Sequence, residues 1–283
     1  MSSLGDRDHS DVPLSGMAVS AASLIRGGKR IVDQASLNLQ AGEVLGILGP
    51  NGAGKSSLIK LMSGEHQPDA GRVYLDGQEL SRWPRAELAR RRAVLPQQLD
   101  VAFGFTAWEV ALLGRIPHHR GIPSRLDREI TWEAMQQLDA ADLADQRYQT
   151  LSGGERARVQ LARVLAQVWS DNPHGQVILL DEPSAPMDVA HQLALSKQLR
   201  DLASAGYAIG VIVHDLNLAA SVCDRVAFMK FGQVLHVGTP QSVFTPDVLA
   251  EVFAVNTEVT FFEQRPHVRL LSVLGQEEQA KVN

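Results

Sequence analysis

Residues 44–57 read Val44-Leu45-Gly46-Ile47-Leu48-Gly49-Pro50-Asn51-Gly52-Ala53-Gly54-Lys55-Ser56-Ser57. The short apolar run predicts a buried strand, the glycines predict a tight turn, and the residues from 56 to 62 predict a helix. Glycines let the backbone turn its N–H groups inward, and a helix N-terminus attracts anions. The pattern G-x-x-x-x-G-K-[ST] between strand and helix therefore predicts a phosphate-binding loop at 49–57, in which Lys55 reaches the β- and γ-phosphates and Ser56 binds Mg²⁺.

A pair of carboxylates follows another apolar run. Val177-Ile178-Leu179-Leu180 is followed directly by Asp181-Glu182. An uninterrupted apolar run is typical of a parallel strand buried on both faces, and ligands of open α/β sheets bind where such strands end. We expect Asp181 to hold Mg²⁺, directly or through water, and Glu182 to orient or deprotonate an attacking water molecule.

A serine and two glycines open a strongly amphipathic helix at 155–168. The sequence there is Leu151-Ser152-Gly153-Gly154-Glu155. Ser152 is a favourable N-cap, and the glycines expose backbone N–H groups, so the helix tip is a second candidate anion site. In isolation this pattern indicates an ordinary capping turn, but together with the two motifs above it favours a site for the same ligand.

Two further polar residues follow predicted strands. His214 lies in Ile212-Val213-His214-Asp215, where its side chain would reach a γ-phosphate, and Gln97 lies in Leu95-Pro96-Gln97-Gln98. Taken alone, each side chain would be interpreted as an ordinary hydrogen-bonded polar residue. We assign them a functional role only because the three motifs above occur in the same chain.

The composition narrows the class of protein. The chain has 283 residues, of which 45% are hydrophobic and 21% are charged, as in ordinary globular proteins. The net charge of −5 argues against nucleic acid as the main partner. The single cysteine, Cys223, excludes a disulfide framework and is expected to be buried. No apolar run is long enough to span a membrane and no signal peptide is visible, so a cytosolic chain is expected.

The order of predicted elements gives the fold class. Strands alternate with helices, which favours an α/β fold around a mostly parallel sheet. We expect a polar tail at 1–16, a nucleotide-binding core with a β subdomain at 17–97 and 159–245, an inserted helical lobe at 98–158, and a C-terminal extension at 246–283. The hairpin near Gly232 closes the core.

These motifs resemble those of ABC transporter ATPases, and they occur in that family's order over about residues 17–245. The resemblance implies a P-loop NTPase core of the RecA type with an antiparallel β subdomain and a helical subdomain. It implies ATP and Mg²⁺ as cofactors, with Glu182 as the catalytic base and His214 as a γ-phosphate sensor. Gln97 would link Mg²⁺ to the helical lobe, and Asp188 would complete the site. Two copies would face each other head to tail, so that each nucleotide lies between one phosphate loop and the other copy's Ser152, Gly153 and Gly154.

A finer resemblance concerns the transported substrate. Gly114-Arg115-Ile116-Pro117-His118 and the residues 214–220 resemble the importer branch for iron chelates, haem and vitamin B12. Ala166-Gln167-Val168-Trp169 and the polar insert up to Gln176 favour haem, with a ferric siderophore or vitamin B12 as the alternative. The resemblance implies two integral-membrane permease subunits, a substrate-binding protein acting through them, and a peripheral position at the cytoplasmic face of the cell (inner) membrane.

Several residues fall outside these motifs. His118 and His119 are expected to be solvated or in contact with the permease rather than bound to haem. The arginines of 82–92 are expected on a solvated helix face, and Arg115, Arg120, Arg125 and Arg128 near the permease or anionic lipid. The family places an aromatic residue near Arg26 to stack on adenine, and here Arg26 itself is the candidate. Pro186 is unusual before Asp188.

Two other classes of protein compete with a transporter subunit. A soluble ABC-type ATPase of DNA repair or translation is disfavoured by the acidic charge and by the short spacing between Lys55 and Leu151, which leaves no room for a long coiled coil. A P-loop GTPase or small-molecule kinase would leave the Leu151–Glu155 motif unexplained, and the sequence has no Asn-Lys-x-Asp base-reading motif.

Overall fold

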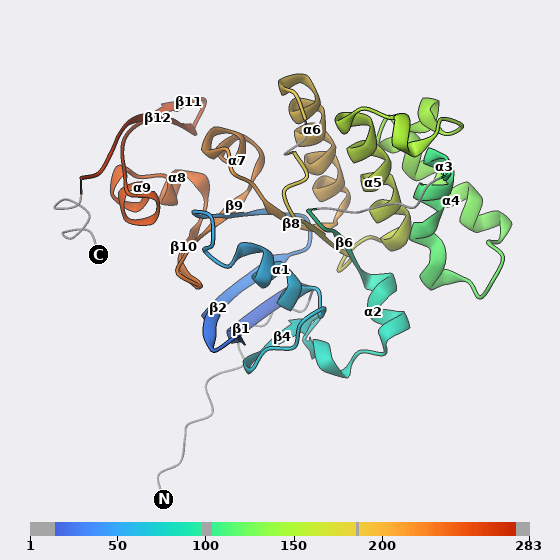
Figure 1. The fold of residues 1–283 in the computed structure, drawn as a ribbon, viewed down its shortest axis with the longest axis horizontal. Coiled ribbons are helices and arrows are strands. Elements are labelled where there is room, and N and C mark those ends of the chain that lie inside the picture. The colour runs from blue at the N-terminus through green and yellow to red at the C-terminus, as the bar shows by residue number, and fades with distance from the viewer. Residues whose placement is uncertain (1–14, 98–103, 185–186, 276–283) are drawn as a thin grey trace, which may run out of the picture.

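A twisted, mostly parallel sheet forms the centre of the computed structural model, which describes residues 15–97, 104–184 and 187–275 (Figure 1). In that part of the chain its strand order is β10-β9-β3-β8-β7-β6. All neighbours are parallel except β10, which pairs antiparallel with β9. The strands are β3 (Val44–Leu48), β6 (Arg92–Leu95), β7 (Val177–Leu180), β8 (Ala208–Ile212), β9 (Arg225–Lys230) and β10 (Gln233–Gly238).

The inner strands are covered on both faces. Every residue of β3, β7 and β8 is buried, which confirms the prediction made from their unbroken apolar runs. Alternate side chains of β3 enter two separate cores: Leu45 and Ile47 join one, and Val44 and Leu48 join the other. The phosphate loop follows β3, Asp181 and Glu182 follow β7, and His214 lies just beyond β8, so these three motifs meet at one edge of this sheet.

An antiparallel sheet packs beside the first core. It contains β1 (Gly16–Arg26), β2 (Lys29–Gln40), β4 (Ala70–Leu75) and β5 (Gln78–Glu79), in the order β2-β1-β4-β5 among the described residues. Apolar residues of β1, β2 and β4 pack with those of α1 (Lys55–Met62). Gly16 already belongs to β1, and the rest of the predicted tail, apart from Ser15, lies outside the described residues.

The helical lobe lies at one end of the molecule (Figure 1). Its elements are α3 (Ala107–Leu112), α4 (Arg125–Gln137), α5 (Gly153–Val168) and the 3-10 turns η2 (Leu113–His118), η3 (Ala141–Leu143) and η4 (Tyr148–Thr150). Trp108 and Trp132 join α3 to α4, with ring centroids 6.0 Å apart. α5 continues without a break across the boundary expected at residue 158, and residues 98–103 at the other boundary are outside the described ranges.

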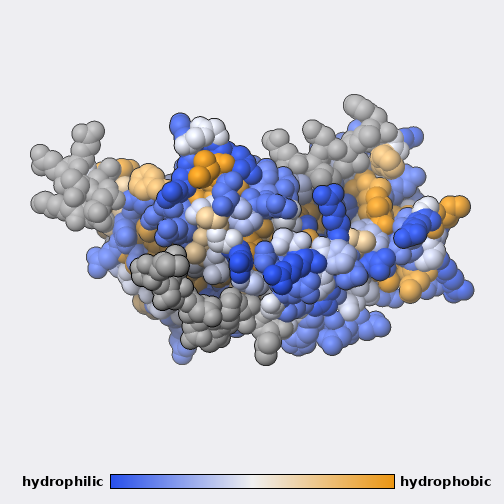
Figure 2. All heavy atoms as spheres, turned by 90° about the horizontal axis from the view of Figure 1, so that it is seen from below, coloured by the Kyte–Doolittle hydropathy of each residue, from blue (hydrophilic) through white to orange (hydrophobic). Residues whose placement is uncertain are grey.

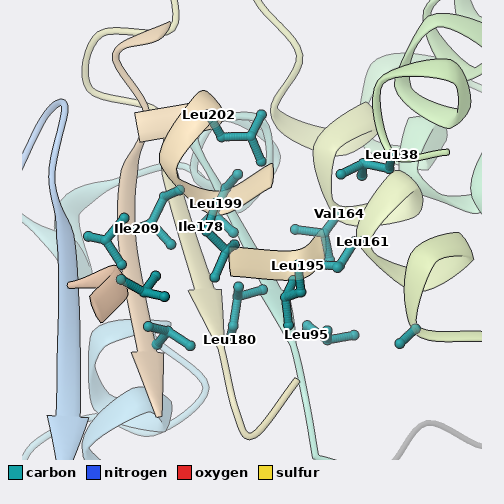
Figure 3. Close-up of a cluster of buried hydrophobic side chains, with 14 of the residues drawn as sticks. Leu95, Leu138, Leu161, Val164, Ile178, Leu180, Leu195, Leu199, Leu202 and Ile209 are labelled. Carbon is teal, nitrogen blue, oxygen red and sulfur yellow. The ribbon is translucent and has the colours of Figure 1, made fainter. Parts of the chain in front are cut away.

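The second core joins this lobe to the sheet. Leu161 and Val164 of α5 pack toward Leu195 and Leu199 of α6 (Val189–Ala205) and toward β7 (Figure 3). Cys223 is fully buried, as expected, and burial raises the pKa of its thiol to about 12. It follows α7 (Leu216–Val222).

The C-terminal extension packs at the end opposite the lobe (Figure 1). It contains α9 (Pro246–Phe253) and a hairpin of β11 (Val255–Phe262) and β12 (Arg265–Val273), and α8 (Pro240–Val243) lies just before its expected start at residue 246. Phe228 of β9 contacts Phe244 and Phe253, with ring centroids 5.3 and 5.8 Å away. Asn217 of α7 exchanges two hydrogen bonds with the backbone of Val268, which fixes the hairpin.

Two expectations about arginines are wrong. Arg115 is buried, with 4% exposure, and its guanidinium bonds Asp127 and the carbonyl of Ala166, so it cannot face a permease or lipid. Arg82, Arg85 and Arg90 are exposed, as expected, but the arginines of 82–92 do not share one helix face. They span η1 (Leu80–Arg82), α2 (Arg85–Arg91) and the start of β6; Arg91 pairs with Asp76, and burial lowers the pKa of Arg92 to about 10.

The face drawn in Figure 2 is mostly hydrophilic among the described residues, with separate apolar patches. Within the described residues, none of the helices combines the length and apolarity that a membrane span requires.

Candidate active site

The phosphate loop is held open by close backbone contacts. A β-carbon at Gly49 would lie 2.1 Å from the carbonyl oxygen of Met229, and one at Gly54 would lie 2.5 Å from that of Ile31, so both positions require glycine. The turn between β9 and β10 supports the loop from outside, because Gly232 N–H donates to the Ala53 carbonyl at 3.0 Å. These contacts restrict the backbone conformations that the loop can adopt.

Lys55 lies inside this loop. Its side chain is buried, and Nζ donates to the carbonyls of Gly49 (2.8 Å) and Pro50 (3.0 Å). Burial lowers the pKa of Lys55, and the charges of Glu182 and Asp181 oppose this shift. A buried ammonium whose partners are neutral carbonyls is well prepared to exchange them for phosphate oxygens.

Ser56 and Asp181 meet at the base of the site. Ser56 Oγ donates to Asp181 Oδ1 at 3.1 Å, and Asp181 N–H donates to the Leu95 carbonyl at 2.9 Å. Burial raises the pKa of Asp181, while the Ser56 hydroxyl opposes this. A hydroxyl and a carboxylate side by side are hard oxygen donors of the kind that Mg²⁺ prefers, so these residues fit the predicted ion.

Glu182 is held by two side chains from neighbouring strand ends. Gln97, beyond β6, donates from Nε2 to Glu182 Oε2 at 2.7 Å, and His214, beyond β8, lies with Nε2 2.5 Å from Oε1. Glu182 has a φ of 55°, in the left-handed region that residues other than glycine seldom adopt. Backbone strain of this kind is often found at functional sites.

A cavity of about 180 Å³ lies between these residues and α5. Gln97, Tyr148, Gly153, Gln160, Asp181 and Glu182 contribute to its lining. The carboxylates therefore have open space beside them, and the first turn of α5 borders that space.

The turn at Ser152–Gly154 is a helix cap in this single chain. Ser152 Oγ accepts a hydrogen bond from Glu155 N–H, and Glu155 Oε2 accepts one from Ser152 N–H. These bonds lower the pKa of Glu155. Within the described ranges no hydrogen bond links this turn to the phosphate loop.

Asp188 caps the next helix. Its Oδ1 accepts hydrogen bonds from His191 N–H at 2.9 Å and from His191 Nδ1 at 2.7 Å, and these bonds lower its pKa. Pro186 lies outside the described residues. Arg26 is half-exposed beside Asp69, 3.6 Å away, and its stacking on adenine stays a prediction.

The structure thus brings the phosphate loop, Asp181, Glu182, Gln97 and His214 together at one sheet edge. Gly153, in the first turn of α5, borders the cavity beside Asp181 and Glu182, whereas Asp188 caps α6. Sequence reasoning missed His191, although the Asp-x-x-His spacing at the start of a helix is a capping pattern that could have drawn attention to it. It also missed Gly232 as a support of the phosphate loop, for which the sequence carries no local signal.

Comparisons with known proteins agree with this geometry. The family model of the ABC transporter matches residues 32–185. A solved metal-chelate type ABC transporter in an inward-facing conformation has the same fold, with a TM-score of 0.77 at 22% identity, covering 92% of this chain and 98% of that one. A dimeric bacterial ABC transporter cassette superposes with a TM-score of 0.68 at 25% identity, over 79% of this chain and 98% of that cassette.

The fold and the site define an α/β P-loop ATPase, and the chain belongs to the ABC transporter family as one of its ATPase subunits. Among curated proteins it is 47% identical to the hemin import ATP-binding protein HmuV of Gloeobacter violaceus, over 82% of this chain and 85% of that protein. It is 45% identical to HmuV of Pseudomonas entomophila, over 90% of this chain and 98% of that protein. It is 44% identical to HmuV of Pseudomonas aeruginosa, over 89% of this chain and 97% of that protein.

Proposed function

We propose that this chain is the energy-coupling ATPase of a haem importer and that it hydrolyses ATP at the edge formed by β3, β7 and β8. The observation that carries the proposal is the convergence of Lys55, the Ser56–Asp181 pair and the Gln97–Glu182–His214 cluster at that edge. These groups supply a phosphate cradle, a metal ligand set and a base in one place.

Each group has a distinct role in this proposal. Backbone N–H groups of residues 49–57 and Lys55 hold the triphosphate, while Glu182 orients and deprotonates the attacking water. His214 contacts the γ-phosphate once it separates from Glu182. Ser56, Asp181 and Gln97 would hold Mg²⁺, which neutralises charge on the β- and γ-phosphates when bound.

The second anion site supports a homodimer. Ser152–Gly154 carries no lysine and has no hydrogen bond to the phosphate loop of its own chain, so its natural ligand is the triphosphate held by a second copy. The likeness to a dimeric cassette supports this arrangement. Asp188, at the start of α6, would lie in the same interface.

The proposed cargo rests on relatives named for hemin import at 43–47% identity. We infer that this chain works beneath two permease subunits at the cytoplasmic face of the cell membrane, and that a binding protein delivers haem from the other side. Haem itself need not touch this chain.

Hydrolysis is tested by two substitutions. Glu182→Gln should keep ATP binding but lose roughly 10²–10⁴-fold in turnover, because the general base is removed.

Lys55→Ala should weaken ATP binding itself, because the side chain that holds the triphosphate is removed. Phosphate release and fluorescent-nucleotide titration measure the two effects, with Glu258→Gln and Lys60→Ala as controls. Undiminished hydrolysis by Glu182→Gln would remove this residue from the role of base.

The cargo is tested on the reconstituted transporter. The permease and binding protein that co-purify with the chain are placed in liposomes, and ATPase activity is measured with haem, a ferric siderophore or vitamin B12 outside. Haem should stimulate activity and accumulate inside. Stimulation by another cargo and not by haem would contradict the proposed substrate.

A further inference from the structure

His191 touches two elements that the proposed dimer places in one interface. It lies in the first turn of α6, three residues after the N-cap Asp188, and its side chain is 35% exposed. Because the Asp188 carboxylate can only accept, the imidazole donates from Nδ1 to Asp188 Oδ1 at 2.7 Å. The imidazole therefore holds the Asp188 side chain in one orientation.

The other side of the imidazole packs on α5. A β-carbon built at Gly154 would lie 3.0 Å from both Cγ and Cδ2 of His191, and 3.3 Å from Nε2. Gly154 does not have a left-handed φ, and a β-carbon there would be in tight contact with this ring, which would have to shift by a few tenths of an ångström to accommodate it. The contact joins two residues 37 positions apart (191 − 154).

A role in capping α6 alone does not explain this arrangement. The backbone N–H of His191 already bonds Asp188 Oδ1 at 2.9 Å, which completes the N-cap without the imidazole. The ring adds a second hydrogen bond to the same oxygen and a contact with a different helix. Its distinctive effect is to fix the start of α6 against the tip of α5.

We propose that His191 is a positioning residue that couples the Asp188 loop to the Ser152–Gly154 turn of the same chain, so that the second copy meets both as one surface. This inference rests on the proposed sandwich dimer. His191 contacts neither the triphosphate nor Glu182, and it acts on turnover through the placement of Gly154 and Asp188.

The test uses the full chain in a Glu182→Gln background, in which bound ATP persists. Sedimentation measures ATP-driven dimerisation, and fluorescent-nucleotide titration at low protein concentration measures ATP binding to the monomer. His191→Ala should weaken dimerisation about tenfold, as expected for a lost charge-assisted hydrogen bond and a lost contact, and should leave monomer affinity within about twofold. His267→Ala, at an exposed position of β12, should change neither quantity.

Partial variants separate the two contacts of the ring. His191→Asn retains a side-chain donor for Asp188 but loses most of the ring, so it should fall between the parent and His191→Ala. Gly154→Ala should weaken dimerisation because its methyl group meets the ring. The double variant His191→Ala/Gly154→Ala should lose less dimerisation affinity than the sum of the losses in the two single variants, because the ring that obstructs the new methyl group is absent.

The outcomes separate this inference from the proposed function. Dimerisation of His191→Ala equal to that of the parent, or losses that simply add in the double variant, would overturn the coupling while leaving the sandwich intact. A parent that stays monomeric with saturating ATP would overturn the sandwich and the coupling with it. In catalytically intact protein, the coupling predicts a lower kcat and a Hill coefficient closer to 1 for His191→Ala.

Discussion

At the scale of single residues, Asp127 shows how one carboxylate organises the helical lobe. Its Oδ2 accepts hydrogen bonds from Ser124 N–H and Oγ at the start of α4, and its Oδ1 accepts one from Arg115 at 3.0 Å. Arg115 in turn donates to the Ala166 carbonyl of α5. A buried arginine with both partners in place is stable, but a buried arginine without its carboxylate is costly.

Asp127→Asn should therefore lower the free energy of unfolding by about 3 kcal/mol, because Arg115 keeps its charge and loses the compensating one. Glu129→Gln breaks the exposed Arg125–Glu129 pair on the same helix and should cost much less than Asp127→Asn, because water screens this pair. Urea denaturation at pH 7 measures both. Equal losses of unfolding free energy in the two variants would show that the buried pair contributes no more to stability than the exposed pair.

The same residue predicts a pH dependence. Burial opposes ionisation of Asp127, but hydrogen bonds from Ser124 and the charge of Arg115 outweigh it and lower its pKa from 3.8 to about 2. A lowered carboxyl pKa stabilises the fold above the unfolded pKa, and this contribution is lost as the pH falls from about 4 to about 2. Asp127→Asn should lack this part of the acid destabilisation, and denaturation curves across that range measure the difference.

At the scale of elements, α4 and α5 begin with the same capping box. Ser124 and Ser152 each accept from the backbone three residues on, and Asp127 and Glu155 reach back to them. The local energetics of the two turns are therefore alike. Only Ser152 is followed by two glycines, and the second of these, Gly154, lies against His191.

Ser152→Ala and Ser124→Ala form a matched pair for this reason. Each should lower stability by about 1 kcal/mol through the lost cap. Only Ser152→Ala should also strongly reduce ATP turnover, because only that turn is proposed to meet the second copy's triphosphate. Thermal melting and ATPase assays measure the two effects, and comparable activity losses in both variants would assign Ser152 to capping alone.

At the scale of the whole molecule, the residues from 240 onward are part of the core rather than an appendage. Phe244 is 1% exposed and packs on Phe228 of the central sheet, whereas Phe262 at the tip of the hairpin is 74% exposed. Arg265 also donates to the Cys223 carbonyl at 3.0 Å. Residues beyond 240 therefore cover one end of the sheet that carries the site.

Phe244→Ala should lower the free energy of unfolding by about 3–5 kcal/mol through lost burial and the cavity it leaves. Phe262→Ala should change it by less than about 0.5 kcal/mol, because the side chain is largely in water in both states. Chemical denaturation of the full chain compares them. A small loss for Phe244→Ala would mean that this aromatic contact contributes little to the core.

Much of the site could be predicted because its chemistry is local. The glycine spacing around Lys55, the apolar run before Asp181 and the cap at Ser152 are each complete within a few residues, and strand ends of a parallel sheet meet at one edge. Arg115 shows the limit of such reasoning. Its charge indicated a surface position, and nothing near it in the sequence reveals that Asp127 and a carbonyl of α5 would compensate for burial.

The amino-acid order alone determined the class of fold, the ligand-binding loop and the residues available for chemistry, because these depend on short-range patterns of apolar, glycine and acidic residues. Only the tertiary structure placed His191 against Gly154, Gly232 behind the phosphate loop and Phe244 against Phe228. These contacts join residues far apart in the chain, and their free energy comes from shape and close packing, which no single segment encodes.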